Sequence, residues 1–239
     1  MLAAPVVAVG GPASVANPLP AVVASPSGVA STATAVRTAS TASHFAFLGL
    51  QPDGWNAIRW NPCVRAITYK INLDGAPAAQ LPSLRAAVAT VAAATGLPLR
   101  YAGTTTAMPT LANIRGGAVT AAARASLVIA FARPGSGAGR STVLRNDGKA
   151  RGGVAWLTYG TAYSRVVSGY VVIPKSMLRL RQSTLRAIYL HELGHAVGLD
   201  HVTDRTQLMY PVVTATSFGR GDLAGLARVG ARMGCLPRG

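Results

Sequence analysis

One stretch of 21 residues, HELGHAVGLDHVTDRTQLMYP at positions 191–211, contains three of the chain's four histidines and its only glutamate. On an α-helix, residues four apart lie on one face, so His191 and His195 can direct their imidazoles at a single point. Glu192 lies about 100° round the helix from His191, close to the pair without belonging to it. Whatever the fold, it has to contain a helix that presents these three side chains together.

Gly198 predicts where this helix ends, because glycine accepts the left-handed conformation that a reversal of the chain requires. After that turn, His201 can supply a third nitrogen from outside the helix. Three histidines with an open fourth position are typical of a catalytic zinc, whereas structural zinc sites are closed by four protein ligands. A carboxylate beside such a site can take a proton from water. We therefore predict His191, His195 and His201 as metal ligands and Glu192 as the catalytic base.

The same residues resemble the zinc-binding motif and Met-turn of the metzincin metallopeptidases, and most closely those of the matrixins, the matrix metalloproteinase family. Met209 lies eight residues after His201 within LMYP, which is the matrixin spacing. The resemblance implies an apolar floor formed by Met209 beneath one catalytic zinc, with Gly198 and Pro211 supporting the site. It also implies a zinc endopeptidase that hydrolyses peptide bonds with an activated water and Glu192 as general base.

Some positions depart from the matrixin pattern. Matrixins bind a second zinc through three further histidines and an aspartate, but only His44 lies outside the motif here, so we expect no second zinc. Asp147 is the single carboxylate between Ser126 and Tyr170, which puts the family's structural calcium sites in doubt. Val202 follows the third histidine where vertebrate matrixins have serine, so the chain is more similar to bacterial matrixin-like proteins.

Hydrophobic periodicity predicts an α/β domain with about five strands and three helices. The expected strands cover residues 66–73, 97–103, 126–132, 153–159 and 169–174, and the expected helices cover 79–95, 184–197 and a segment beginning near residue 222. Ser183 and Asp222 are candidate caps of the last two helices, and the last should bury Leu223, Leu226, Val229 and Met233. Residues 104–125 and 136–152 are expected to be loops.

The resemblance implies the α+β zincin fold of the metzincins, in which a mixed, twisted sheet precedes the active-site helix, the Met-turn and a C-terminal helix. In that fold, residues 153–159 form the edge strand, along which an extended peptide substrate binds as an added antiparallel strand. Ala187 matches the position one helical turn before the first zinc histidine, so it is expected at the specificity pocket.

The N-terminal region differs in composition from the rest of the chain. Residues 1–16 have a short apolar stretch and a signal-peptidase-like Ser14-Val15-Ala16, but no basic residue precedes Arg37. They are either the remnant of a signal peptide or an alanine-rich tail. Residues 17–44 contain mainly Ala, Ser, Thr, Val and Pro and are expected to be a linker or leader. The catalytic domain is expected to span residues 45–239.

Cys63 and Cys235 lie near the two ends of the expected domain, and their even number in an exported chain favours a disulfide. Two alternatives are a pair of unrelated thiols and a role for Cys63 in blocking the zinc of a latent form. The disulfide is preferred over the latency role, because Cys63 lies only a few residues before the first strand and has little slack to reach the metal. A secreted or envelope-associated location follows from the disulfide and the N-terminal segment.

The chain has 23 basic and 7 acidic residues, a net charge of +16. These basic residues are scattered, without the runs or interleaved aromatics of a nucleic-acid-binding surface, so we expect non-specific binding to polyanions at most. No apolar run is long enough to span a membrane. The expected partner is a protein or peptide substrate, and the expected state is a monomer. Two alternative functions are a zinc hydrolase of cell-wall peptides and a non-hydrolytic, cationic metal-binding envelope protein.

Overall fold

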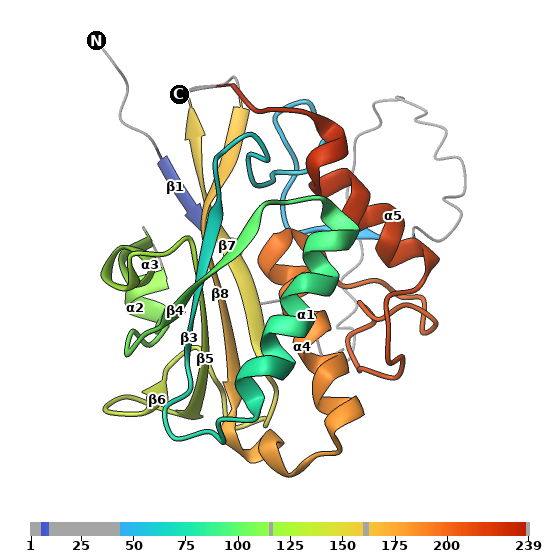
Figure 1. The fold of residues 1–239 in the computed structure, drawn as a ribbon. Coiled ribbons are helices and arrows are strands. Elements are labelled where there is room, and N and C mark those ends of the chain that lie inside the picture. Colours follow the sequence, from blue (N-terminus) through green and yellow to red (C-terminus); the bar gives the residue numbers. More distant parts are fainter. Residues whose placement is uncertain (1–5, 10–43, 115–116, 160–162, 238–239) are drawn as a thin grey trace, which may run out of the picture.

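The computed structural model describes residues 6–9, 44–114, 117–159 and 163–237. They form a mixed sheet with the strand order β1-β7-β8-β5-β3-β4, and β6 pairs separately with β5 (Figure 1). Strands β3, β4, β5 and β8 are parallel, whereas β7 runs antiparallel to β8. The bounds are Val6–Val9 for β1, Ile67–Asn72 for β3, Leu99–Thr104 for β4, Leu127–Pro134 for β5, Arg140–Ser141 for β6, Arg151–Tyr159 for β7 and Tyr163–Pro174 for β8.

Three longer helices cover one face of the sheet: α1 (Gln80–Thr95), α4 (Gln182–Val197) and α5 (Arg220–Val229) (Figure 1). Two short helices, α2 (Leu111–Ile114) and α3 (Ala118–Ala123), lie on the opposite face. The remaining elements are the 3-10 helices Lys175–Arg179 and Ala231–Met233 and a small antiparallel pair, β2 (Ala46–Phe47) with β9 (Leu199–Asp200). The predicted mixed α+β architecture is confirmed.

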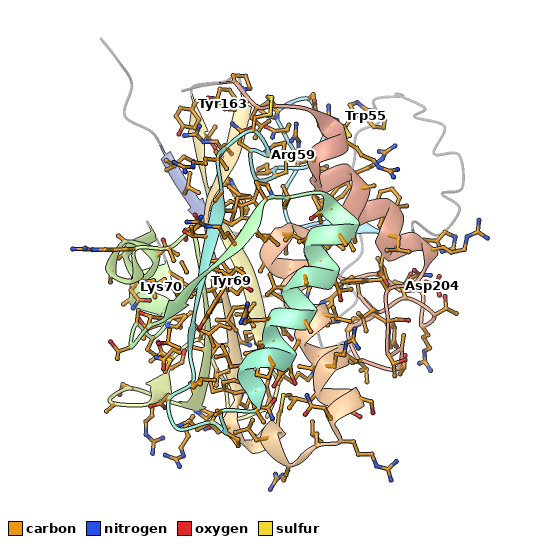
Figure 2. The ribbon with its side chains drawn as sticks, viewed as in Figure 1. Trp55, Arg59, Tyr69, Lys70, Tyr163 and Asp204 are labelled. Carbon is orange, nitrogen blue, oxygen red and sulfur yellow. A yellow bond between two sulfur atoms is a disulfide. The ribbon has the colours of Figure 1, made fainter. Side chains whose placement is uncertain are left out.

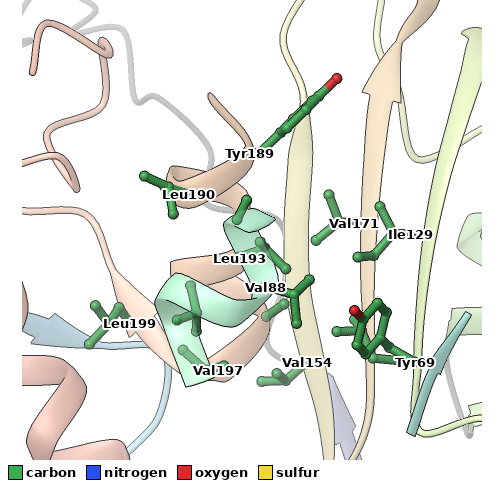
Figure 3. Packing of buried hydrophobic residues seen from close by; sticks show 14 of the residues in the cluster. Tyr69, Val88, Ile129, Val154, Val171, Tyr189, Leu190, Leu193, Val197 and Leu199 are labelled. Atoms are coloured by element: carbon green, nitrogen blue, oxygen red, sulfur yellow. The ribbon is translucent and has the colours of Figure 1, made fainter. Parts of the chain in front are cut away.

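The main core lies between the sheet and helices α1 and α4 (Figure 3). Residues 127–132 of β5 are completely buried, as expected for an apolar strand in the middle of a sheet with both faces covered. Val88 of α1 and Leu193 of α4 belong to this core. The two helices are also joined by a buried hydrogen bond of 2.8 Å from the Tyr189 hydroxyl to Oε1 of Gln80. This packing fixes α4, which carries the histidine motif, against the sheet.

The prediction of Ser183 as the N-cap of a helix that begins at residue 184 is wrong, because Ser183 lies within the first turn of α4. Helix α4 begins at Gln182 and has no side-chain cap. The expected loop 104–125 is also wrong in part, since it contains α2 and α3. Apolar side chains of these two helices, such as Ile114 and Val119, belong to a second buried cluster on the far face of the sheet.

Two of the four apolar residues predicted to be buried by the last helix are exposed. Leu226 and Val229 are buried, but Leu223 is 47% exposed and Met233 is 42% exposed. Helix α5 turns its Asp222 face inward, which carries Leu223 about 100° away from the core. Met233 lies beyond the end of α5, in the following 3-10 helix.

A disulfide joins Cys63 to Cys235 across 172 residues of sequence. Beside it, the Arg59 guanidinium, labelled in Figure 2, donates hydrogen bonds of 2.9 Å to the carbonyl oxygens of both Met233 and Gly234. The predicted disulfide is therefore confirmed. The alternative in which Cys63 blocks the zinc is wrong, because its sulfur is already bonded.

Strand β7 is not a free edge, contrary to the expectation for residues 153–159. Strand β1 pairs with it antiparallel, from Val6 opposite Thr158 to Val9 opposite Ala155. Within the described residues, no helix has both the length and the apolar character needed to cross a membrane.

Candidate metal centre

Helix α4 and the turn after it bring the three motif histidines together. The helix ends at Val197, and Gly198 adopts a left-handed conformation with φ 117°, as its position in the motif predicted. The Gly198 carbonyl accepts a hydrogen bond of 2.9 Å from the Leu48 N–H, which fixes the turn to the preceding segment. Pairing of β9 with β2 then holds the next two residues, so that His201 returns toward the helix.

The three Nε2 atoms converge. His191 and His201 are separated by 3.1 Å between these atoms, and His195 lies 3.2 Å from each of them. Nδ1 of His191 is 2.7 Å from the Leu208 carbonyl oxygen, and Nδ1 of His195 is 2.8 Å from the Leu199 carbonyl oxygen. Because a carbonyl only accepts, Nδ1 of both rings carries the proton, and their Nε2 atoms present lone pairs.

This arrangement fits a zinc ion. Nitrogen ligands bind zinc at about 2.0–2.1 Å, so two of them in a tetrahedral site lie about 3.3–3.4 Å apart. The observed separations of 3.1 and 3.2 Å differ from this by a few tenths of an ångström. Lone pairs that face one another at such distances repel unless a cation lies between them. The hydrogen bonds at Nδ1 are the orienting contacts that metal-binding histidines normally make.

Burial keeps the three imidazoles neutral, which is the form that binds a metal. It lowers the pKa of His191 to about 4, although the hydrogen bond to the Leu208 carbonyl acts in the opposite direction. Burial also lowers the pKa of His195 well below its usual value, and the neighbouring histidines add to this effect. Burial also lowers the pKa of His201, although the negative charge of Asp200 acts to raise it.

Glu192 is buried at the wall of a cavity of about 250 Å³ that also contains the three histidines. Burial raises the pKa of its carboxyl group to about 8, while the Arg151 guanidinium and a hydrogen bond from the Gly152 N–H act to lower it. Besides these residues, the cavity is lined by Lys149, Met177, Thr184, Ile188, Pro211, Val212 and Val213. A single acidic group therefore lies beside a possible metal position in a largely apolar recess.

Two glycines allow close approaches around α4. A Cβ on Gly152 of β7 would collide with the backbone carbonyl of Glu192, so this glycine lets the strand pass directly over the helix. A Cβ on Gly194 would lie 2.6 Å from Sδ of Met209. Met209 thus packs against the helix between the two histidines that α4 supplies. It is buried.

The loop that contains Met209 is held by a network of hydrogen bonds. The Val202 N–H donates to the Met209 carbonyl at 3.1 Å, next to the third histidine. Asp222 of α5 is fully buried and accepts hydrogen bonds from the N–H groups of Leu208 at 2.6 Å, Met209 at 3.2 Å and Gly219 at 2.9 Å. Asp222 therefore caps its own helix, as predicted, and also fixes the carbonyl that orients His191.

The network continues to the start of the domain. Gln207 accepts from the Asp222 N–H at 3.1 Å and donates to Oδ2 of Asp204 at 3.0 Å. Nδ1 of His44 lies 2.9 Å from the same Asp204 oxygen (Figure 2 labels Asp204). His44, the one histidine outside the motif, thus lies apart from the three converging rings. Within the described residues, the group of candidate ligands is His191, His195 and His201.

Sequence reasoning missed most of the cavity wall. Ala187 was expected at the specificity pocket, but it is buried in the core and the cavity is lined by Thr184 and Ile188 instead. Ala187 lies one helical turn before His191, but its short side chain is enclosed in the main core and does not reach the recess. No sequence signal marked Lys149 or Arg151. Asp222 was predicted only as a helix cap, and its hydrogen bonds to the N–H groups of Leu208 and Met209 were not predicted.

The mixed sheet, the helix that carries two of the histidines, the loop with Met209 and the C-terminal helix are consistent with a matrixin-type metzincin fold. Residues 124–226 match the family model of the matrixin peptidases. A 45-residue segment is 40% identical to a protein of Trichoplusia ni ascovirus 2c named "Putative matrix metalloproteinase", and covers 19% of this chain and 9% of that protein. The chain spans only this small part of its relative. Residues 124–226, which contain the three converging histidines, are thus similar to the matrixin peptidases, and the findings support a matrixin-like metzincin.

Proposed function

We propose that the protein is a secreted, zinc-dependent endopeptidase. The observation that carries the proposal is the convergence of three Nε2 lone pairs, from His191, His195 and His201, beside the buried carboxyl group of Glu192. The match of residues 124–226 to the matrixin model supports a peptidase of the metallo class. A site built only to store metal would not need a carboxylate at the wall of the same cavity.

His191, His195 and His201 would hold the zinc ion. When bound, zinc supplies Lewis acidity, which polarises a carbonyl group and makes water more acidic. The Glu192 carboxylate accepts the proton of the attacking water and later delivers it to the nitrogen of the leaving amine. The Gly152 N–H holds this carboxylate in place. The apolar part of the cavity wall, which includes Met177, Ile188 and Val213, restricts water around the reacting group.

The shape of the cleft supports an extended peptide as the substrate. Strand β7 passes over the active-site helix at Gly152 and continues away from the cavity, so a peptide paired with it would be led past Glu192. The cavity would take an apolar side chain against Met177, Ile188 and Val213. Secretion is supported by the Cys63–Cys235 disulfide, since such bonds persist mainly in oxidising compartments.

Substitution of the proposed base tests the reaction separately from metal binding. Glu192→Gln keeps the size of the side chain and all three histidines, so we expect about one zinc per chain and a loss of hydrolysis of about 100- to 10,000-fold. Asp53→Asn is the matched control, because Asp53 is an exposed acid in a turn that lies outside the cavity. Zinc is measured by native mass spectrometry and hydrolysis with a fluorogenic peptide library.

Three results would contradict the proposal. Full activity in Glu192→Gln would remove the carboxylate from the reaction. Hydrolysis that persists in 1,10-phenanthroline would remove the metal. Zinc binding without cleavage of any peptide by the unaltered protein would favour a non-hydrolytic metal-binding protein, and cleavage of cell-wall fragments alone would favour a wall hydrolase.

A further inference from the structure

The outer edge of β7 has the composition of a surface that accepts another strand. Exposed sheet edges in proteins are usually protected by charged residues or proline. From Gly152 to Tyr159, β7 has neither, although the chain carries a net charge of +16. Trp156 and Leu157, which point to opposite faces of the sheet, are both half-buried. An added strand would therefore meet apolar side chains on both faces.

A segment of the chain itself pairs with this edge. Strand β1, with the sequence VVAV, runs antiparallel to β7, and its Val7 lies opposite Leu157 and its Ala8 opposite Trp156. Three of its four residues are valine, which is well suited to an extended backbone. The occupant is thus extended, small and apolar, as the edge requires.

The direction of β1 is important for the active site. Its last residue, Val9, lies opposite Ala155, which is three residues after Gly152 at the cavity wall. At about 3.4 Å per residue, this distance is roughly 10 Å. The strand therefore covers the part of the edge that leads up to Glu192. A peptide substrate paired with β7 in the same direction would need the backbone groups that β1 already uses.

We propose that Val6–Val9 is a built-in competitor for the substrate edge, and that this edge selects extended segments of small, apolar, β-branched residues. The effect on hydrolysis rests on the proposed peptidase function, whereas the pairing of β1 with β7 does not depend on that function. A segment in the same chain acts at an effective concentration in the millimolar range, and four paired residues bind weakly. Displacing β1 should therefore lower KM by about two- to tenfold.

The test uses the full chain with Val7→Pro and Ala8→Pro together. In an antiparallel pair, alternate residues donate to the partner strand, so one of these two prolines removes a hydrogen bond to β7. The matched control is Val29→Pro with Ala30→Pro, the same pair of residues in a segment outside the described part of the chain. Intact mass verifies that all three proteins retain Met1. Amide hydrogen exchange of residues 151–159 and the KM and kcat for a valine- and alanine-rich peptide are measured.

We expect faster exchange in β7 and a lower KM with unchanged kcat in the Val7/Ala8 variant, and values equal to the parent in the control. Equal exchange and equal KM in parent and variant would overturn the proposal. A parent KM that depends on protein concentration would also overturn it, because the competing strand would then come from a second molecule. If none of the proteins hydrolyses the peptide, the peptidase function fails, while the exchange comparison still decides whether β1 occupies the edge.

Discussion

Asp222 connects the last helix to the metal centre, and its removal should damage both stability and zinc binding. Its carboxylate is fully buried and accepts hydrogen bonds from three backbone N–H groups, those of Leu208, Met209 and Gly219. In Asp222→Ala, these donors remain buried without an acceptor. Each such donor costs about 1–3 kcal/mol, so three cost about 3–9 kcal/mol.

Part of this loss is offset, because the variant no longer buries a charged group. Burial raises the pKa of Asp222 in spite of its three hydrogen-bond donors, which indicates that burying the charged carboxylate is itself unfavourable. We therefore expect the free energy of unfolding to fall by about 3–5 kcal/mol. Asp222→Asn retains one acceptor oxygen of similar geometry and should lose less than Asp222→Ala.

Asp222→Ala should also weaken zinc binding by His191, although Asp222 does not contact His191 directly. Loss of the Met209 N–H contact frees the peptide group that includes the Leu208 carbonyl, whose oxygen lies 2.7 Å from Nδ1 of His191. Removing an orienting partner of a metal ligand typically lowers metal affinity by about 10- to 100-fold. Urea unfolding with and without zinc, and competition with a zinc chelator, measure the two effects. An Asp222→Ala protein within about 1 kcal/mol of the parent and with unchanged zinc affinity would refute this reasoning.

Two further predictions concern the whole domain. In the chain-entropy account, opening a loop of 172 residues by replacing Cys63 and Cys235 with serine should lower the free energy of unfolding by about 5 kcal/mol, measured by urea titration; an unchanged midpoint would contradict it. In the metal-free protein, burial lowers the pKa of His191 from 6.5 to about 4. Between these two pH values, His191 is therefore protonated in the unfolded chain but neutral in the folded protein. Stability should then fall by about 3 kcal/mol as pH drops from 6.5 to 4, and a thermal midpoint that is flat over this interval would exclude the effect.

The sequence predicted the site better than its surroundings. The spacing of His191, His195, Gly198 and His201 determines their arrangement, because each step follows from helix geometry and one left-handed turn. The strands near residues 67 and 127 were also predictable, since their apolar alternation and apolar run reflect burial that is local to each strand.

Other features depended on contacts between distant residues. Leu223 is exposed because Asp222 turns α5 toward a loop 14 residues earlier, and no periodicity within the helix contains that information. The cavity wall combines Arg151 from β7 with Ile188 from α4, so neither residue has a local signature. The pairing of β1 with β7 joins segments almost 150 residues apart, and an apolar N-terminal segment fits several other roles equally well.

The disulfide has a consequence for what happens when the chain is cut by a peptidase. Cys63 and Cys235 enclose every strand from β3 to β8, helices α1 to α5 and all three converging histidines within one covalent ring. A single cut in any surface loop inside that ring would open it without releasing a fragment. The two pieces would stay tethered at their outer ends, with the core between them still able to hold together. A nicked molecule could thus remain one particle, and would lose its parts only after a second cut or reduction.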